Sequence, residues 1–144
     1  RARAAIGVRT LAARLRALTP AAAPRRVVVV DDSPLVTAEV GDRLRADGWE
    51  VEAAADVEST LRLVREWRPQ VVLMDVNMPG LTLADLCART RAAAASALAI
   101  CLLSGASDAE LTAHARAVGA DGWVSKVAGL GVVVERVRAM AGAT

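Results

Sequence analysis

Short apolar runs alternate with amphipathic stretches along most of this chain. After residue 26 the apolar runs are typical of strands buried on both faces, and the stretches between them repeat their apolar positions every three or four residues, as helices do. The predicted strands cover 27–30, 49–53, 71–75, 97–103 and 122–125, and the predicted helices cover 35–46, 57–67, 83–91, 107–118 (including the N-cap) and 132–140.

Several helix boundaries are marked by residues that cap or end helices. Ser33-Pro34 suits an N-cap followed by the first helical residue, and Asp47-Gly48 suits a helix end. Ser107 and Glu110 have the spacing of a capping box.

Because five strands alternate with five helices, the chain is predicted to be an α/β protein with a doubly wound, five-stranded parallel sheet that helices cover on both faces.

The first 24 residues have a different pattern. Apolar residues from Val8 to Leu18 recur at helical spacing among arginines, which predicts an amphipathic helical extension over about 4–18. The segment 19–24 is rich in Pro and Ala and is predicted to be a linker. The expected organisation is therefore a helix and linker over 1–24 and one domain over 25–144. A dimerising helix, the end of a preceding domain, an anion-seeking arm and a remnant without a role all remain open for 1–24.

Composition and charge narrow the class of protein. The chain is 54% hydrophobic but has no Phe or Tyr and only three Trp, so its core is expected to be built from Val, Leu and Ala. Its longest apolar run, 97–103, is much shorter than the roughly 20 residues of a membrane span. Two Cys without CxxC spacing favour a reducing compartment. We therefore expect a cytoplasmic protein without membrane contact.

The charges are unevenly distributed. Residues 1–26 contain seven of the 18 basic residues and none of the 16 acidic ones, so the rest of the chain carries 11 basic and 16 acidic residues. An acidic domain repels the phosphates of nucleic acids. Direct binding of nucleic acid by the globular part is therefore not expected.

Polar residues follow four of the five predicted strands. Asp31 and Asp32 follow the first strand, Asp75 ends the third, Ser104 follows the fourth and Lys126 follows the fifth. In a parallel sheet these ends meet at one edge, where ligands bind. Converging carboxylates repel one another unless a cation lies between them, and Mg²⁺ prefers such oxygen ligands. A hydroxyl and an ammonium beside them suit phosphoryl oxygens, so the pattern predicts phosphoryl transfer to a carboxylate.

Lys126 is the single Lys among 18 basic residues; the other 17 are Arg. All the remaining basic positions carry Arg. A lone Lys at a strand end indicates that a compact ammonium is needed there rather than a planar guanidinium.

With these residues assembled, the stretch of about 26–140 resembles the response regulator receiver domain of two-component signalling, which has a flavodoxin-like fold. Each motif is weak alone, but their order and spacing are specific. The motifs are Val-Val-Val-Val-Asp31-Asp32-Ser-Pro, Leu-Met-Asp75-Val-Asn-Met-Pro-Gly, Leu-Leu-Ser104-Gly and Gly-Ala-Asp-Gly-Trp123-Val-Ser-Lys126.

The resemblance implies a phosphoacceptor and a metal site. Asp75 is expected to accept a phosphoryl group from a histidine kinase or a phosphotransfer protein. Asp31 and Asp32 are expected to hold Mg²⁺, with Asp32 and Asp75 as direct ligands and the backbone carbonyl of Asn77 as a further one. The protein would then be no enzyme beyond its own phosphorylation and dephosphorylation.

The resemblance also implies a switch. Ser104 and Lys126 are expected to contact the phosphoryl oxygens. Trp123 stands at the aromatic switch position, where the family usually has Tyr or Phe. An output protein or domain is expected to bind the face formed by the fourth helix, the fifth strand and the fifth helix, and a second copy of the chain is a further candidate partner.

Two positions depart from the family pattern. Val127 follows Lys126 where the family usually has Pro after a cis bond, and a cis bond before a residue other than Pro costs roughly 3 kcal/mol. We therefore expect a trans bond and a differently shaped loop. Leu83 stands where a Gly is usual, so the loop after Asp75 is also expected to differ.

Three function classes compete for these residues. A phosphorylation-switched binding module is favoured, and an interaction domain that keeps the fold without the phosphate cycle is the alternative. A phosphohydrolase with an aspartyl-phosphate would usually show Asp-x-Asp after its first strand, whereas Asp31 and Asp32 are adjacent. The single histidine, His114, is predicted to be incidental.

Overall fold

Five parallel strands form one sheet at the centre of the protein. The computed structural model describes residues 25–95, 97–105 and 108–143. The strands pair side by side in the order β2-β1-β3-β4-β5, and every pairing is parallel. Their bounds are β1 (Arg26–Val30), β2 (Glu50–Ala54), β3 (Val71–Asp75), β4 (Ala99–Ser104) and β5 (Gly122–Ser125).

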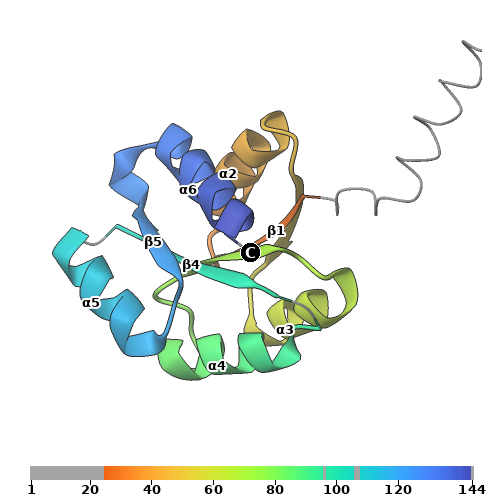
Figure 1. Cartoon of the computed structure of the whole chain (residues 1–144), viewed down its shortest axis with the longest axis vertical. Helices are drawn as coiled ribbons and strands as arrows, with labels where there is room; N and C mark the ends of the chain where they lie inside the picture. Colours follow the sequence, from red (N-terminus) through yellow and green to blue (C-terminus); the bar gives the residue numbers. More distant parts are fainter. Residues whose placement is uncertain (1–24, 96, 106–107, 144) are drawn as a thin grey trace, which may run out of the picture.

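Helices cover both faces of the sheet (Figure 1). Two of them, α2 and α6, lie on one face, and α3, α4 and α5 lie on the other. This arrangement confirms the predicted doubly wound fold. The predicted helix over 4–18 and the predicted cap at Ser107 lie outside the described residues. The helix bounds are α2 (Pro34–Ala46), α3 (Val57–Trp67), α4 (Leu83–Ala93), α5 (Asp108–Val118), the short 3₁₀ helix η1 (Lys126–Ala128) and α6 (Leu130–Ala143).

Alternation along the strands divides the core into two halves. In β1, Val27 and Val29 pack on the α2/α6 face with residues such as Leu44, whereas Val28 and Val30 pack on the opposite face. All four β1 valines are fully buried. Burying one such side chain stabilises the fold by roughly 1.5–3 kcal/mol, so apolar burial is what holds the strand ends in place.

Three strands differ in their bounds from the prediction; the first begins one residue earlier, at Arg26, and the second ends one residue later, at Ala54. The second strand begins at Glu50, because the Trp49 N–H donates to Leu44 O (3.1 Å) and so closes α2 instead of pairing with β1. Trp49 itself is buried, as expected for a packing residue. The fourth strand begins at Ala99, where the first ladder bond to Gln70 O forms, and continues to Ser104.

The end of the chain also differs from the prediction. Helix α6 extends beyond the predicted 132–140 at both ends, and the turn η1 was not predicted.

The capping pattern of the first helix is confirmed, since the Ser33 hydroxyl accepts a hydrogen bond from the Val36 N–H and Pro34 begins the helix.

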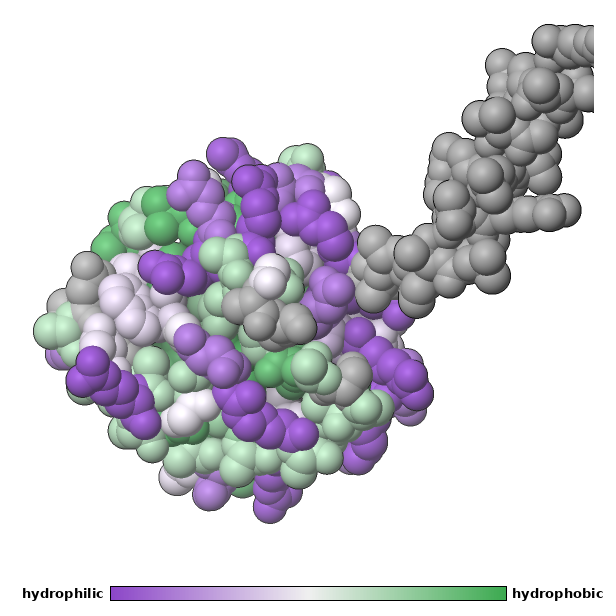
Figure 2. Space-filling model, in the orientation of Figure 1, coloured by the Kyte–Doolittle hydropathy of each residue, from purple (hydrophilic) through white to green (hydrophobic). Residues whose placement is uncertain are grey.

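On the face that Figure 2 shows, a strongly apolar patch lies among hydrophilic and weakly apolar residues. In the space-filling view this patch lies at the upper left, where Figure 1 draws the segment between β5 and α6 (Figure 2). In the chain, Val127 of η1 is 82% exposed and Val132, near the start of α6, is 40% exposed. Within the described part of the chain, none of the helices is both long and apolar enough to span a membrane.

Gly119 allows a test of how much the positive φ after α5 requires a glycine. It follows α5 with a φ of +73°, a conformation that residues with a Cβ rarely adopt, and open space surrounds it. We expect Gly119→Ala to lower the free energy of unfolding by about 1 kcal/mol. Gly142→Ala is the matched control, because it adds the same methyl to open space within α6 at an ordinary φ. Urea unfolding measures both variants, and equal losses would contradict the argument.

Candidate functional site

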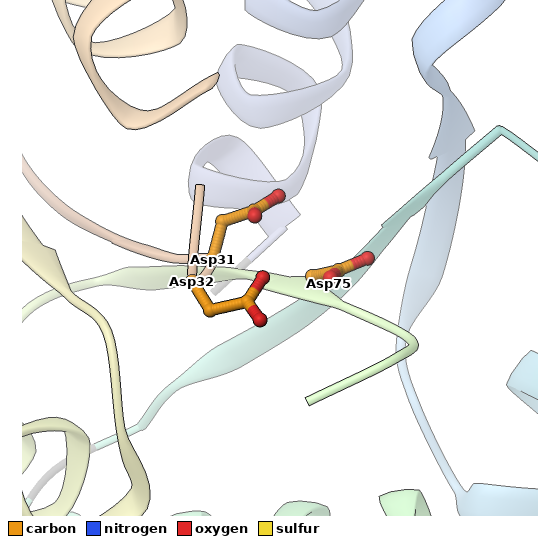
Figure 3. A group of neighbouring side chains, drawn as sticks. All are labelled: Asp31, Asp32 and Asp75. Atoms are coloured by element: carbon orange, nitrogen blue, oxygen red, sulfur yellow. The ribbon is translucent and has the colours of Figure 1, made fainter. Parts of the chain in front are cut away.

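The carboxyl ends of the strands bring an acidic cluster together at one edge of the sheet (Figure 3). Asp31 and Asp32 come directly after β1, and Asp75 is the last residue of β3. One carboxylate oxygen from each of the three lies within 4.8 Å of the other two. The predicted convergence of these side chains is therefore present in the fold.

Asp31 and Asp32 differ in their surroundings. Asp31 is 2% exposed, and its Oδ1 accepts a hydrogen bond of 2.9 Å from the Ser33 N–H. Asp32 is exposed, and Figure 3 shows its carboxylate directed toward Asp75. Asp31 is thus held by the protein itself, whereas Asp32 is accessible to a ligand from solvent.

Lys126 lies between two of the carboxylates. Its Nζ is 3.1 Å from Asp31 Oδ2 and 3.7 Å from Asp75 Oδ1. Its side chain is half-buried, while both carboxylates are buried. A compact ammonium can approach two carboxylates at once, which gives a physical reason for a Lys at this position in a chain that otherwise uses Arg.

The charge of Asp75 is only partly balanced. Burial raises the pKa of Asp75 above its ordinary value of 3.8, and the nearby charge of Asp31 raises it further. The Lys126 ammonium and a hydrogen bond from the Asn77 N–H oppose this shift, and Asp32 adds to it. The ionised cluster therefore retains unfavourable repulsion, which a divalent cation with oxygen ligands would relieve. The donor set fits Mg²⁺; the role of the Asn77 carbonyl stays a prediction.

Ser104 is buried at the end of β4 and borders a surface groove. The residues that line the groove with it come from the segment after β3 and from one face of α5. Sequence reasoning missed this groove, and it treated His114 as incidental. The available signal was the spacing of Glu110, Ala113 and His114, which are i, i+3 and i+4 and so share one face of α5. The lining residues are Val76, Asn77, Ser104, Glu110, Ala113 and His114.

Trp123 lies on the strand next to Ser104. It pairs in register with Leu102 of β4, so alternation places Trp123 and Ser104 on the same face of the sheet, toward α5. Its side chain is partly buried, and the guanidinium of Arg136 from α6 lies 5.9 Å from the ring centroid. The predicted switch residue is thus placed between the helices that flank β5.

The loop after Lys126 has the predicted trans bond, since the described residues contain no cis peptide bond. The Val127 N–H donates to Ser125 Oγ (3.3 Å), a hydrogen bond that Pro could not donate, and this bond closes the turn η1. In the loop after Asp75, Gly80 has a φ of +103° and Thr82 caps α4. Leu83 is partly buried against the core.

The chain is similar to known proteins over most of its length. Residues 27–138 match the family model of the response regulator receiver domain. The transcriptional regulatory protein PrrA of Mycobacterium leprae is 35% identical over 115 residues, which are 80% of this chain and 49% of that protein. The DNA-binding response regulator MtrA of Mycolicibacterium smegmatis is 34% identical over 115 residues, which are 80% of this chain and 50% of that protein.

A solved structure shows the same similarity. The chemotaxis protein CheY4 of Vibrio cholerae superposes with a TM-score of 0.72 at 29% identity, covering 82% of this chain and 99% of that one. By contrast, this chain spans about half the length of PrrA and MtrA.

The acidic cluster predicts an unusual effect on stability. The pKa of Asp75 is higher in the folded state than its ordinary value of 3.8. Protonation of Asp75 therefore stabilises the fold fully below pH 3.8. This stabilisation is lost as the pH rises through the folded-state pKa. In chelator at pH 7, Asp75→Asn and Asp32→Asn should therefore increase the free energy of unfolding. Glu52→Gln is the control, because it removes one negative charge from an exposed side chain on β2, outside the cluster. Chemical denaturation measures all three, and clear destabilisation by the cluster variants would contradict the argument.

Proposed function

The chain belongs to the response regulator receiver domain family, and on that premise we propose that it is a phosphorylation-switched domain that accepts a phosphoryl group on Asp75. The observation that carries the proposal is the ammonium of Lys126 within 3.7 Å of a buried Asp75, in a cluster with Asp31 and Asp32. Receiver domains act in two-component signalling and are not enzymes in the usual sense. We propose residues 25–144 as this domain and 1–24 as a separate helix and linker.

The proposed reaction moves a phosphoryl group from a histidine to Asp75. A carboxylate oxygen of Asp75 attacks the phosphorus, and the bond between phosphorus and the imidazole nitrogen of the kinase or phosphotransfer protein breaks. Lys126 would hold one phosphoryl oxygen, and the Ser104 hydroxyl would donate to another. These groups act mainly by position and charge, since phosphoryl transfer requires little other chemistry from the protein.

Receiver domains bind Mg²⁺ at an acidic pocket, and the oxygen donors of this cluster fit that ion. In this chain Asp31, Asp32 and Asp75 would hold it, with the carbonyl of Asn77. Bound Mg²⁺ would neutralise charge on the phosphoryl oxygens. The protein's own contribution is to keep Asp31 oriented through the Ser33 N–H and to leave Asp32 exposed.

The proposed output runs from Ser104 to Trp123. A phosphoryl group adds negative charge and acceptor oxygens, which attract the Ser104 hydroxyl. Inward movement of Ser104 would leave space on the α5 face, and the Trp123 indole could fill it, hiding apolar area worth on the order of 1–3 kcal/mol. Such a change would alter the face formed by α5, β5 and α6, where we propose that an output partner binds.

The first test of this proposal is direct labelling of the acceptor. Incubation with acetyl phosphate and Mg²⁺ should add one phosphate to the intact protein, and Asp75→Asn should abolish the addition. Asp56→Asn is the matched control, because Asp56 is an exposed N-cap of α3 outside the cluster and Asn caps a helix equally well. Intact-protein mass spectrometry measures the added mass.

Two results of this labelling would redirect the proposal. Persistent labelling of Asp75→Asn would move the acceptor to another residue. If the unmodified chain is not labelled, the alternative is favoured, which is a receiver-like interaction domain without the phosphate cycle. The structural observation that supports this alternative is the changed loop at Val127.

A second test follows the switch by fluorescence. In a Trp49→Phe, Trp67→Phe background, Trp123 is the sole indole, and phosphorylation should change its emission because the ring moves between a partly buried and a more buried environment. Adding Ser104→Ala should reduce that change. Unaltered emission in protein that mass spectrometry shows to be phosphorylated would mean that the output uses another surface.

A further inference from the structure

A groove runs along the seam between α2 and α6, which lie side by side on one face of the sheet (Figure 1). It consists of three adjoining hollows with volumes of about 100, 520 and 280 Å³. Along α2 and its C-cap the groove extends from Val36 to Asp47, which is about 16 Å at 1.5 Å per residue. Adjoining hollows share lining residues, which are Glu39 and Leu130 for the first two and Arg43 and Ala46 for the last two.

Apolar residues line the depth of this groove, and acidic residues stand at both of its sides. Val40 and Val133 line the first hollow and are buried. Glu39 and Asp42 are exposed on α2 and line the second hollow, and Glu135 is exposed on α6 and lines the third. A segment that fits this groove therefore offers an apolar stripe with cationic side chains on both flanks.

Most of the basic residues in the lining are engaged within the protein. Arg138 forms an ion pair with the C-cap of α2, and Lys126 belongs to the cluster at the strand ends. The third, Arg43, is exposed on α2. Glu39 and Glu135 take part in none of the ion pairs among the described residues. One carboxylate on each side of the groove is thus left for a cationic ligand.

The chain enters the domain at one end of this groove. The Arg25 guanidinium donates to Asp47 O (3.4 Å) and pairs with Asp47 Oδ2 (3.5 Å), and it lies 4.5 Å from the centroid of the Trp49 ring. Arg25 is the first described residue, and Asp47 lines the third hollow. The segment 1–24 therefore joins the domain beside the groove.

The expected linker 19–24 has the length that docking in this groove requires. Six residues in an extended, Pro-rich conformation span about 19 Å at 3.1 Å per residue. The connections 47–49 and 68–70, which join a helix to a strand, are shorter, but they reach only the helices that touch the sheet. A helix on top of α2 and α6 lies one layer further out, roughly 8–10 Å. The longer linker spans that additional distance.

The helix predicted over 4–18 matches the groove in length and in pattern. Its apolar stripe from Val8 to Leu18 is about 15 Å long, close to the length of the groove. At about 100° per residue, Arg9 and Arg16 lie to one side of this stripe and Arg14 lies to the other. Exposed ion pairs contribute little stability, so the apolar stripe supplies the affinity and the arginines set the orientation.

We propose that the segment 4–18 docks as a helix in the α2/α6 groove of its own domain. The anchor at Arg25 sets the direction, with Leu18 at the Asp47 end and Val8 toward Val36, so the segment runs parallel to α2. Docking is intramolecular because a short linker gives the segment an effective concentration of about millimolar at its own groove. It requires no phosphorylation, so its test is independent of the proposed function.

Cysteine cross-linking in the full chain tests this arrangement. Leu15→Cys with Ala46→Cys should form a disulfide within one chain at least about fivefold faster than Leu15→Cys with Ala117→Cys. Ala46 and Ala117 are both exposed at positions in helices, but Ala117 belongs to α5 on the other face of the sheet. The natural Cys87 and Cys101 are buried and do not compete in the folded chain. Non-reducing electrophoresis and mass spectrometry separate links within one chain from links between two.

Two results of the cross-linking would overturn the inference. Equal rates for the Ala46 and Ala117 pairs would show that the segment has no preference for the groove. A disulfide that forms only between two chains would place the segment on a second copy instead of on its own domain.

A second measurement needs no introduced cysteine. Leu15→Ser removes apolar area from the docked stripe, so the urea concentration at the midpoint of unfolding should fall by about 0.5 M. Ile6→Ser is the matched control, because Ile6 lies on the opposite side of the predicted helix at 100° per residue, and its midpoint should equal that of the unmodified chain. Equal midpoints for the two variants would contradict docking through this stripe.

Discussion

Repulsion among three carboxylates at the edge of the sheet is the constraint on which the rest of the site depends. The fold holds Asp31, Asp32 and Asp75 close together because the strands that carry them are pinned by apolar burial on both faces. Lys126 offsets part of this repulsion, while burial first, and then the nearby charges of Asp31 and Asp32, raise the pKa of Asp75. A site in this condition favours a cation with oxygen ligands.

The fold and the cluster could be predicted from the sequence because both follow from the order of the elements. Once strands and helices alternate, parallel pairing places every strand's carboxyl end at one edge, and the residue after each strand is then part of the site. Asp75 and Lys126 are 51 positions apart, yet topology alone brings them together. No side-chain detail is needed for that inference.

The parts that could not be predicted depend on packing between elements. Trp49 had the character of a strand residue, but its N–H closes α2, a choice that only the three-dimensional path of the helix decides. The groove at Ala113 and His114 depends on how α5 lies over the sheet and on the loop that carries Asn77. Spacing shows which residues share a face of α5, but it does not show what that face borders.

The two faces of the sheet explain why one phosphoryl group could change a distant surface. Alternation along β3 places Asp75 on the same side as Leu73, toward α2 and α6, whereas Ser104 shares its side with Leu102, toward α5. A phosphoryl group held by Lys126 and Ser104 would therefore span the edge between the two faces. In the proposed switch, Ser104 would transmit its charge to the α5 side, where Trp123 already packs. Because Arg136 of α6 lies over that indole, movement of the ring would affect both helices that flank β5.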